Sequence, residues 1–193
     1  MTGITPDALL TRRRLGGAVL VVAGIVLAAV VLWPRGDSGR ATPPQPVRLV
    51  SVPQLGLALA HPRTWKASTE GRVLRLRSAD GSALLTFSAP VAGRHSTGVK
   101  AALKSALLER LRPSKVVRDG AGRLGDRQVT SFEVSGRAAK GRVRALALVD
   151  STPYRTYAVT LLTGARPSRR RLAEVQQILG TVRLTKPVLR SKK

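Results

Sequence analysis

The feature that most constrains this chain is a stretch of twenty residues without a charged side chain between Arg14 and Arg35. Residues 15–33 can form one continuous helix, because Pro34 ends it. At about 1.5 Å per residue, this helix would reach about 28 Å, close to the roughly 30 Å hydrocarbon core of a bilayer. The stretch is apolar on all sides, and Trp33 lies where an interfacial aromatic residue belongs. We therefore predict one transmembrane helix over residues 15–33, with the lipid bilayer as its partner.

A cleaved signal peptide is the alternative interpretation of the same stretch. Signal peptides typically carry an apolar region of about 7 to 15 residues and end in a small-x-small cleavage site. Here the apolar run is longer and ends in Leu-Trp-Pro-Arg-Gly. These differences favour a retained anchor.

The distribution of arginines predicts the orientation of the span. Three arginines abut its start at positions 12–14. On the far side the basic residues are spread more thinly, with an acid among them: Arg35, Asp37, Arg40 and Arg48. Positive charge close to the end of a span favours the cytoplasmic side. We predict a single-pass protein of the cell membrane, with residues 1–14 as a basic cytoplasmic N-terminus and the rest of the chain extracytoplasmic.

Composition divides the chain beyond the span into three segments. Residues 34–46 are rich in Pro and Gly and predict a short linker. Residues 47–185 carry patterned apolar residues and are enough for one domain with its own core. Residues 186–193 form a basic tail.

Period-two apolar runs within residues 47–185 predict strands. The first run places three leucines on one face: Leu55, Leu57 and Leu59. Asp80-Gly81 predicts a hairpin with four apolar side chains on its buried face: Leu74, Leu76, Leu85 and Phe87. Further strands are expected over residues 127–135, 142–149, 154–162 and 181–184.

Two segments have helical periodicity. The first begins at Ser96 or Thr97 as a cap and is followed by Pro113. The second begins after Ser168, and Gly180 stands where a left-handed cap is expected. The predicted fold class is α+β: a mostly antiparallel sheet with two packed helices, preceded by one transmembrane helix.

The order of these elements resembles the PsbP-like and Mog-type superfamily. In that superfamily a strand leads into a Pro-x-x-Trp turn, here Pro62 to Trp65, and the domain ends with a helix and a short strand, here residues 172–184. An aromatic residue often precedes the Pro, and Ala60-His61 stands in its place. The resemblance implies a membrane-anchored bacterial envelope protein with a binding or assembly role. It transfers no functional residue.

The charge of the chain points to anionic partners. The formal net charge is +24, and 29 basic against 8 acidic residues leave +21 from Ala41 onward. Such a field attracts nucleic acid, anionic lipid head groups or acidic envelope polymers. A high-GC genome is the other explanation, because 26 of the 34 basic residues are arginine.

We find no catalytic, metal or cofactor constellation in the sequence. Cysteine is absent, and the two histidines, His61 and His95, have no neighbour at ligand spacing. The acids have structural explanations. Some lie beside Gly or in turns: Asp80, Asp119, Asp126 and Asp150. Others lie on helices beside arginine or stand alone: Glu109, Glu174, Glu70 and Glu133. We expect no cofactor and no enzymatic activity.

One local feature predicts an anion site. The first turn of the second helix holds Arg169, Arg170 and Arg171, where the helix dipole favours negative charge. Two arginine pairs at i,i+2 spacing on strands are candidates to extend the same surface: Arg75 and Arg77, and Arg142 and Arg144. Simple solvation in an arginine-rich chain is the alternative explanation for all seven arginines, and it is the favoured one for the helix turn.

The sequence therefore predicts a non-enzymatic, membrane-anchored extracytoplasmic module. Its basic surface would dock a protein partner, lipid head groups or an anionic envelope polymer. Nucleic-acid binding is the alternative, but the domain holds only five aromatic residues for stacking: Trp65, Phe87, Phe132, Tyr154 and Tyr157. An enzyme with an unrecognised site is the remaining hypothesis.

Overall fold

The computed structural model describes residues 46–92, 95–139 and 141–187. The predicted transmembrane helix at residues 15–33 and the N-terminal segment 1–14 lie outside the described residues. So do the linker up to residue 45 and the basic tail beyond residue 187. Among the helices that are described, none is both long and apolar enough to cross a bilayer.

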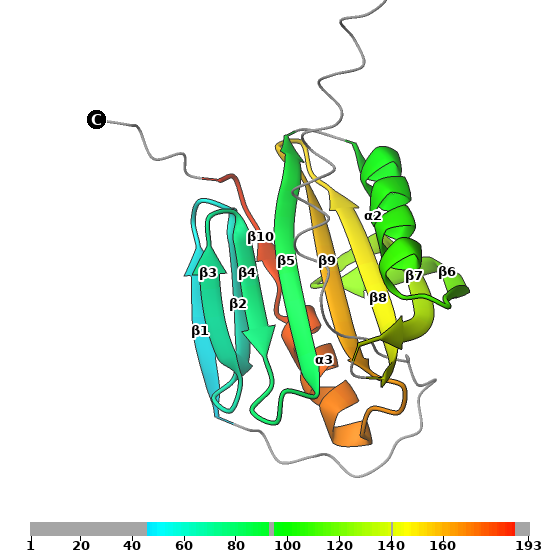
Figure 1. Cartoon of the computed structure of the whole chain (residues 1–193). Helices are drawn as coiled ribbons and strands as arrows, with labels where there is room; N and C mark the ends of the chain where they lie inside the picture. Colours follow the sequence, from blue (N-terminus) through cyan, green and yellow to red (C-terminus); the bar gives the residue numbers. More distant parts are fainter. Residues whose placement is uncertain (1–45, 93–94, 140, 188–193) are drawn as a thin grey trace, which may run out of the picture.

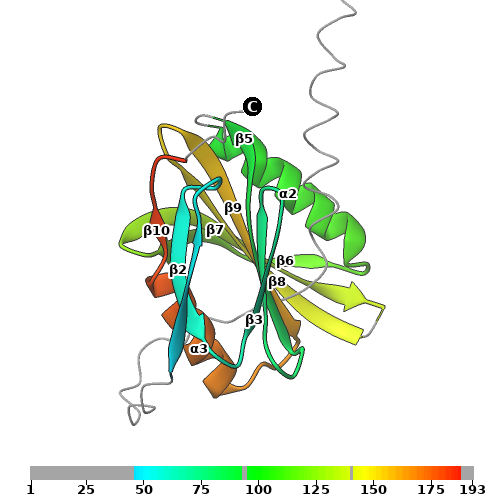
Figure 2. The same cartoon turned by 90° about the vertical axis from the view of Figure 1, so that its left-hand side faces the viewer.

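The domain has three layers (Figures 1 and 2). The middle layer is a seven-stranded sheet in the order β3-β4-β5-β9-β8-β7-β6. Its strands are β3 (Lys66–Glu70), β4 (Val73–Arg77), β5 (Ala83–Ala92), β6 (Lys115–Leu124), β7 (Arg127–Ala138), β8 (Gly141–Ser151) and β9 (Arg155–Gly164). Helix α2 (Ser96–Arg110) covers one face, and helix α3 (Arg169–Gly180) lies on the other (Figure 2).

A small second sheet shares the layer of α3. Its order is β1-β2-β10, with β1 (Val47–Val52), β2 (Leu57–Pro62) and β10 (Arg183–Leu184). All pairings in both sheets are antiparallel. The prediction of an α+β fold with two helices and a mostly antiparallel sheet is confirmed for the described residues.

Alternation along the strands sorts side chains onto the two faces of the large sheet. Leu76 pairs with Leu85, and Leu85 pairs with Leu161, so these side chains share the face that carries α3. We call this the α3 face and the opposite one the α2 face. The buried apolar side chains on both faces belong to one hydrophobic cluster. It also includes Leu103 and Leu107 of α2 and Ile178 of α3.

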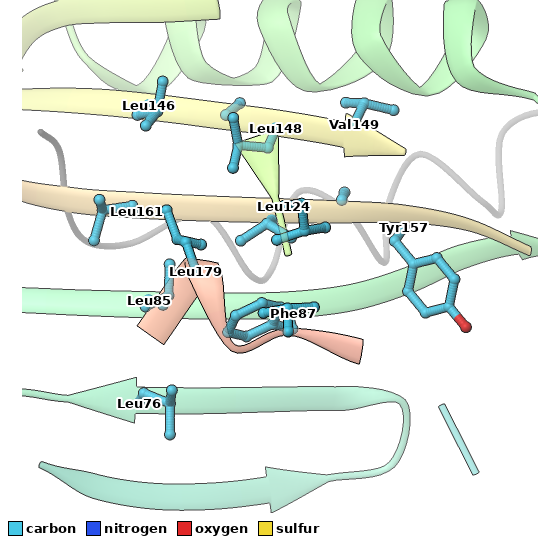
Figure 3. Packing of buried hydrophobic residues seen from close by; sticks show 14 of the residues in the cluster. Leu76, Leu85, Phe87, Leu124, Leu146, Leu148, Val149, Tyr157, Leu161 and Leu179 are labelled. Atoms are coloured by element: carbon cyan, nitrogen blue, oxygen red, sulfur yellow. The ribbon is translucent and has the colours of Figure 1, made fainter. Parts of the chain in front are cut away.

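The core between the large sheet and α3 is aliphatic with few aromatic residues (Figure 3). Phe87, Leu148 and Leu179 are each no more than 2% exposed. The leucines expected on the buried face of the first strand and of the hairpin are all buried: Leu55, Leu57, Leu59, Leu74, Leu76 and Leu85. Burial of this apolar surface is the main term that stabilises the three layers.

Strand β9 holds the turn between β1 and β2 by two hydrogen bonds. The Tyr157 hydroxyl donates to the carbonyl of Leu55 at 2.6 Å, and Arg155 Nη1 donates to the carbonyl of Gln54 at 2.6 Å. Both side chains are more than nine-tenths buried. The two sheets are therefore joined by specific polar contacts as well as by apolar packing.

The ends of the helices agree with the sequence in part. Ser168 caps α3 as predicted, because its hydroxyl accepts from the Arg171 amide. The prediction of a left-handed cap at Gly180 was wrong: Gly180 is the last helical residue, and Thr181 follows with φ −90°. Helix α2 begins at Ser96, but its N-cap residue is His95, which forms no side-chain cap.

Three strands were not among those predicted: β1, β3 and β6. Of these, β6 matters most for the surface. It contains Asp119, which we had placed in a turn, but Asp119 pairs with Phe132 of β7 inside the strand. Asp150, also assigned to a turn, lies in β8 opposite Tyr157 and is 5% exposed.

Candidate anion-binding groove

A groove of about 640 Å³ lies where β6, β7 and β8 meet. Four basic side chains line it, and we call it the basic groove: Lys115, Arg137, Arg142 and Arg144. Strand pairing brings them together, since Arg137 lies opposite Arg142, and Lys115 and Arg144 both lie opposite Ser135. All four therefore project from the α3 face.

No acidic residue lines the basic groove within the described part of the chain. The nearest compensating acid is Glu133, whose Oε1 lies 2.5 Å from Nη2 of Arg144. The pair is buried, with side-chain exposures of 4% and 13%. Arg137 and Arg142 are exposed and form no ion pair with a described acid. The groove is therefore a site of net positive charge to which an anion would be attracted.

The environment of Glu133 is unusual for a carboxylate. Burial is the largest effect and raises its pKa above the ordinary glutamate range, although the charges of Arg144 and Arg118 act in the opposite direction. Its Oε1 accepts no hydrogen bond of good geometry despite the close approach of Arg144. Glu133, which the sequence suggested to stand alone, is in fact tied to Arg144 across the two strands.

A second hollow of about 490 Å³ lies beside the basic groove on β6 and β7. Leu146, Leu148, Ser131 and Glu133 contribute to its lining, together with Arg118 and Arg123 from β6. Glu133 lines this hollow, whereas Arg144 lines the basic groove. The ion pair thus separates two adjoining depressions of different chemistry.

The three arginines at the start of α3 lie in a different environment from the one their spacing predicted. Arg171 forms an ion pair with Glu174 and, at 2.9 Å, with Asp80. Arg170 Nε lies 3.1 Å from Glu174 Oε1. The unfavourable charge at the helix N-terminus is therefore balanced by carboxylates of the protein itself. Only Arg169 of the three makes no ion pair with a described residue.

Trp65 completes this arrangement beneath α3. Its Nε1 donates to Glu174 Oε2 at 2.9 Å, and the guanidinium of Arg171 lies 5.4 Å from the ring centroid. Asp80 bonds the hydroxyl of Ser78 and the amide of Ser82, and these bonds lower its pKa well below the ordinary aspartate range. The first turn of α3 is a structural cluster that joins the Pro-x-x-Trp turn to the hairpin.

The two strand pairs of arginines do not form one surface. Arg75 lies opposite Thr86, which places it on the α2 face, and Arg77 shares that face. Arg142 and Arg144 lie on the α3 face. Arg75 is also paired with Glu70 at 2.5 Å. The hypothesis that both pairs extend a common surface was wrong, because the register sets them on opposite sides of the sheet.

Lys115 and Arg137 were not predicted as binding residues from the sequence. Lys115 was overlooked because β6 was not predicted. Arg137 lies just beyond the predicted end of its strand at residue 135. The signal for Arg137 was present, since Arg137 and Arg142 flank a short turn and would face each other in any hairpin closed there.

In the part of the chain that the structure describes, histidines and acids do not gather into a recognisable reaction centre. His61 is buried, with its Nδ1 2.8 Å from the carbonyl of Pro62. Asp150 is held by Arg127 in a two-point contact at 2.5 and 3.0 Å. Within residues 46–92, 95–139 and 141–187, no group of three or more metal-ligating side chains lies together.

The fold of the domain is similar to that of solved structures. The sequence matches no protein-family model and no curated protein. The solution structure of the cyanobacterial PsbP protein (CyanoP) from Synechocystis matches with a TM-score of 0.54 at 13% identity. The match covers 80% of this chain and 99% of that chain. The domain thus has a fold similar to that of PsbP, consistent with the resemblance drawn from the sequence.

Two further solved structures match less well. A protein from Bacteroides thetaiotaomicron matches with a TM-score of 0.49 at 15% identity, over 72% of this chain and 48% of that one. The immunity protein TplEi of T6SS from Pseudomonas aeruginosa matches with a TM-score of 0.41 at 12% identity, over 79% of this chain and 54% of that one. This chain thus spans about half the length of both.

Proposed function

We propose that this protein is a membrane-anchored, extracytoplasmic and non-enzymatic binding module that docks an anionic partner in the basic groove. The observation that carries the proposal is the convergence of Lys115, Arg137, Arg142 and Arg144 on one depression that no described acid lines. Sequence supports the anchor, since residues 15–33 are long and apolar enough to span a bilayer. A PsbP-like fold is compatible with a binding or assembly role.

Arginines suit this role because each guanidinium presents several donors in a rigid plane and retains its charge at any physiological pH. Arg142 and Arg137 lie directly opposite each other on adjacent strands, so a phosphate or carboxylate between them would contact both. Without a ligand, two like charges at this spacing repel each other. An anion would remove that repulsion.

Charge reversal in the groove tests the proposal. The full-length protein is placed in bilayers of neutral lipid, and binding of long-chain polyphosphate is measured at increasing salt. We expect salt-sensitive binding that weakens about tenfold or more in the Arg137→Glu/Arg142→Glu variant. The control is Lys66→Glu/Arg77→Glu, which changes the net charge by the same amount at paired positions on β3 and β4. Equal loss in both variants would mean that net charge alone, and not the groove, attracts the polymer.

Nucleic-acid binding is less well supported by the structure. Trp65, Phe87, Phe132 and Tyr157 are all buried, and Tyr154 is the one aromatic residue of the described chain with an exposed side chain, at 48%. A stacking platform needs several exposed rings. A gel-shift titration at low salt distinguishes the alternatives, since the proposed function predicts no preference for nucleic acid over polyphosphate of equal charge.

A further inference from the structure

Strand β6 forms one outer edge of the large sheet. It is the last strand in the order, and β7 is its only partner among the described residues. Its pairing with β7 is regular from Arg118 to Leu124, after a bulge near Val116. Along this stretch the backbone groups that point away from β7 have no strand beside them. An open edge of this length is a template for another strand.

The opposite edge of the same sheet, β3, is protected against pairing. Strand β3 is only five residues long and carries Lys66 and Glu70. Short length and charged side chains are the usual means by which proteins block edge pairing. Strand β6 is twice as long. It carries Lys115, Arg118, Asp119 and Arg123 and a bulge near Val116, but residues 120–122 have no charged side chain and no proline.

The one charged side chain within residues 119–122 is drawn away from the edge. Asp119 lies 2.5 Å from Nζ of Lys100 and 3.1 Å from Nζ of Lys104, both on α2. These contacts lower the pKa of Asp119, so it stays ionised and held against the helix. The remaining residues of the stretch are Gly120, Ala121 and Gly122. No long side chain there shields the backbone.

Gly120 has no explanation within the described chain. A Cβ at this position would meet nothing within 4 Å, and its backbone is not in the left-handed region. Gly122 differs, because a Cβ there would lie 2.7 Å from Cδ2 of Leu148. A glycine inside a strand weakens it, and it often marks a place where another backbone approaches. Gly120 is consistent with an external strand at this edge.

The charge around β6 selects the kind of strand that fits. Lys115, Arg118 and Arg123 are exposed along it, and Asp119 is already neutralised by α2. A second copy of this chain is a poor partner, because the net charge of +24 and these three cations would be set against themselves. An acidic partner complements both the edge and its field.

We propose that β6 accepts an extended acidic segment of a partner protein as an eighth strand of the large sheet. The proposal deepens the proposed function, on which it rests for an anionic partner, by assigning a protein segment and a pairing surface. Backbone hydrogen bonds along Arg118 to Leu124 would supply affinity, and Arg118 and Arg123 would favour acidic side chains.

Two peptides of equal charge test the pairing. The first alternates glutamate and threonine, and the second has every other threonine replaced by proline, which cannot donate a backbone hydrogen bond. Binding to the full-length protein in neutral bilayers is followed by fluorescence anisotropy and by hydrogen exchange of the β6 amides. We expect the proline peptide to bind about tenfold or more weakly, because several hydrogen bonds are lost. Only the first peptide should protect amides within residues 118–124.

Variants locate the site on the chain. Arg118→Gln and Arg123→Gln should each weaken binding of the first peptide about two- to fivefold, as expected for exposed charge pairs. Lys66→Gln on the opposite edge should leave it unchanged. Equal binding of both peptides without protection of β6 would overturn strand addition and leave charge attraction. Absence of peptide binding in a protein that still binds polyphosphate in its groove would overturn this inference alone, whereas loss of both would also remove the proposed function.

Discussion

Glu133 and Arg144 form a buried ion pair that crosses from β7 to β8 on the α3 face, with 2.5 Å between Oε1 and Nη2. The two residues are not directly opposite, since Glu133 faces Leu146 and Arg144 faces Ser135. Their diagonal contact places one carboxylate beside Arg144, which lines the basic groove. The pair therefore offsets one of the four positive charges that line the basic groove, and its burial makes it a candidate contributor to stability.

Removal of Arg144 should destabilise the domain strongly at neutral pH. Arg144→Met leaves Glu133 buried without its ion-pair partner, and we expect the free energy of unfolding to fall by about 3 kcal/mol. Arg142→Met is the matched control on the same strand, because Arg142 is exposed, and it should cost less than about 0.5 kcal/mol. Urea denaturation at pH 7 measures both. Equal effects would show that the ion pair contributes nothing specific.

The raised pKa of Glu133 also predicts a pH dependence. The folded state binds a proton on Glu133 more readily than the unfolded state does. The stability that this proton confers is present below the ordinary glutamate pKa and is lost as pH rises through the raised value. Glu133→Gln should therefore flatten the fall in stability between acidic and neutral pH. Denaturation curves at several pH values would contradict this if the two proteins changed in parallel.

The two glycines of β6 should respond oppositely to the same substitution. Gly122→Val places a side chain against Leu148 and Ser131, and overpacking of this kind costs about 1–3 kcal/mol. Gly120→Val enters open space and improves strand propensity, so stability should stay equal or rise by up to about 1 kcal/mol. Thermal denaturation of the two variants provides the comparison, with loss of stability in Gly120→Val as the contrary result.

Glu174 should be critical for the attachment of α3. Its carboxylate is 5% exposed and accepts hydrogen bonds from Trp65, Arg170 and Arg171. Glu174→Ala leaves these donors unpaired and should cost about 2–3 kcal/mol. In a Trp33→Phe background, Trp65 is the one tryptophan, and its emission should shift to the red as water reaches the ring. An unchanged spectrum would argue against the contact.

The hydroxyl of Tyr157 should stabilise the junction of the two sheets. Burial raises the pKa of this phenol, so it remains a donor to the Leu55 carbonyl. Tyr157→Phe should lower the free energy of unfolding by about 1–2 kcal/mol, because that carbonyl loses its buried partner. Tyr154→Phe is the control at an exposed tyrosine and should have almost no effect. Similar losses in the two variants would contradict the assignment.

The elements with a regular apolar pattern could be predicted from the sequence. The hairpin around Gly81, which has φ +67°, and the cap at Ser168 depend on neighbours a few residues away, and both were predicted correctly. Strand β6 was not, because its glycines and charges have low strand propensity. It is a strand because β7 lies beside it, and pairing overrides propensity.

The candidate site was harder to predict from the sequence than the fold, for a related reason. The ion pair between Arg171 and Asp80 joins two residues 91 positions apart in the chain. No local sequence pattern predicts such a contact. Arg171 and Glu174, by contrast, are three positions apart on one helix, so their contact could be anticipated from the sequence. That Arg75 and Arg142 lie on opposite faces follows from the register across four strands, which spacing along one strand does not determine.

Strand β2 lies between β1 and β10, and the amide of Ala60 bonds the hydroxyl of Thr181 across 121 positions of sequence. The sheet that begins with the first strands of the domain, β1 and β2, is thus completed by its last strand, β10. Until β10 has been synthesised, one edge of β2 has no partner strand. Contacts between distant residues form slowly, so this edge stays unpaired for longer. The small sheet therefore cannot be completed until α3 and β10, residues 169–184, have been synthesised.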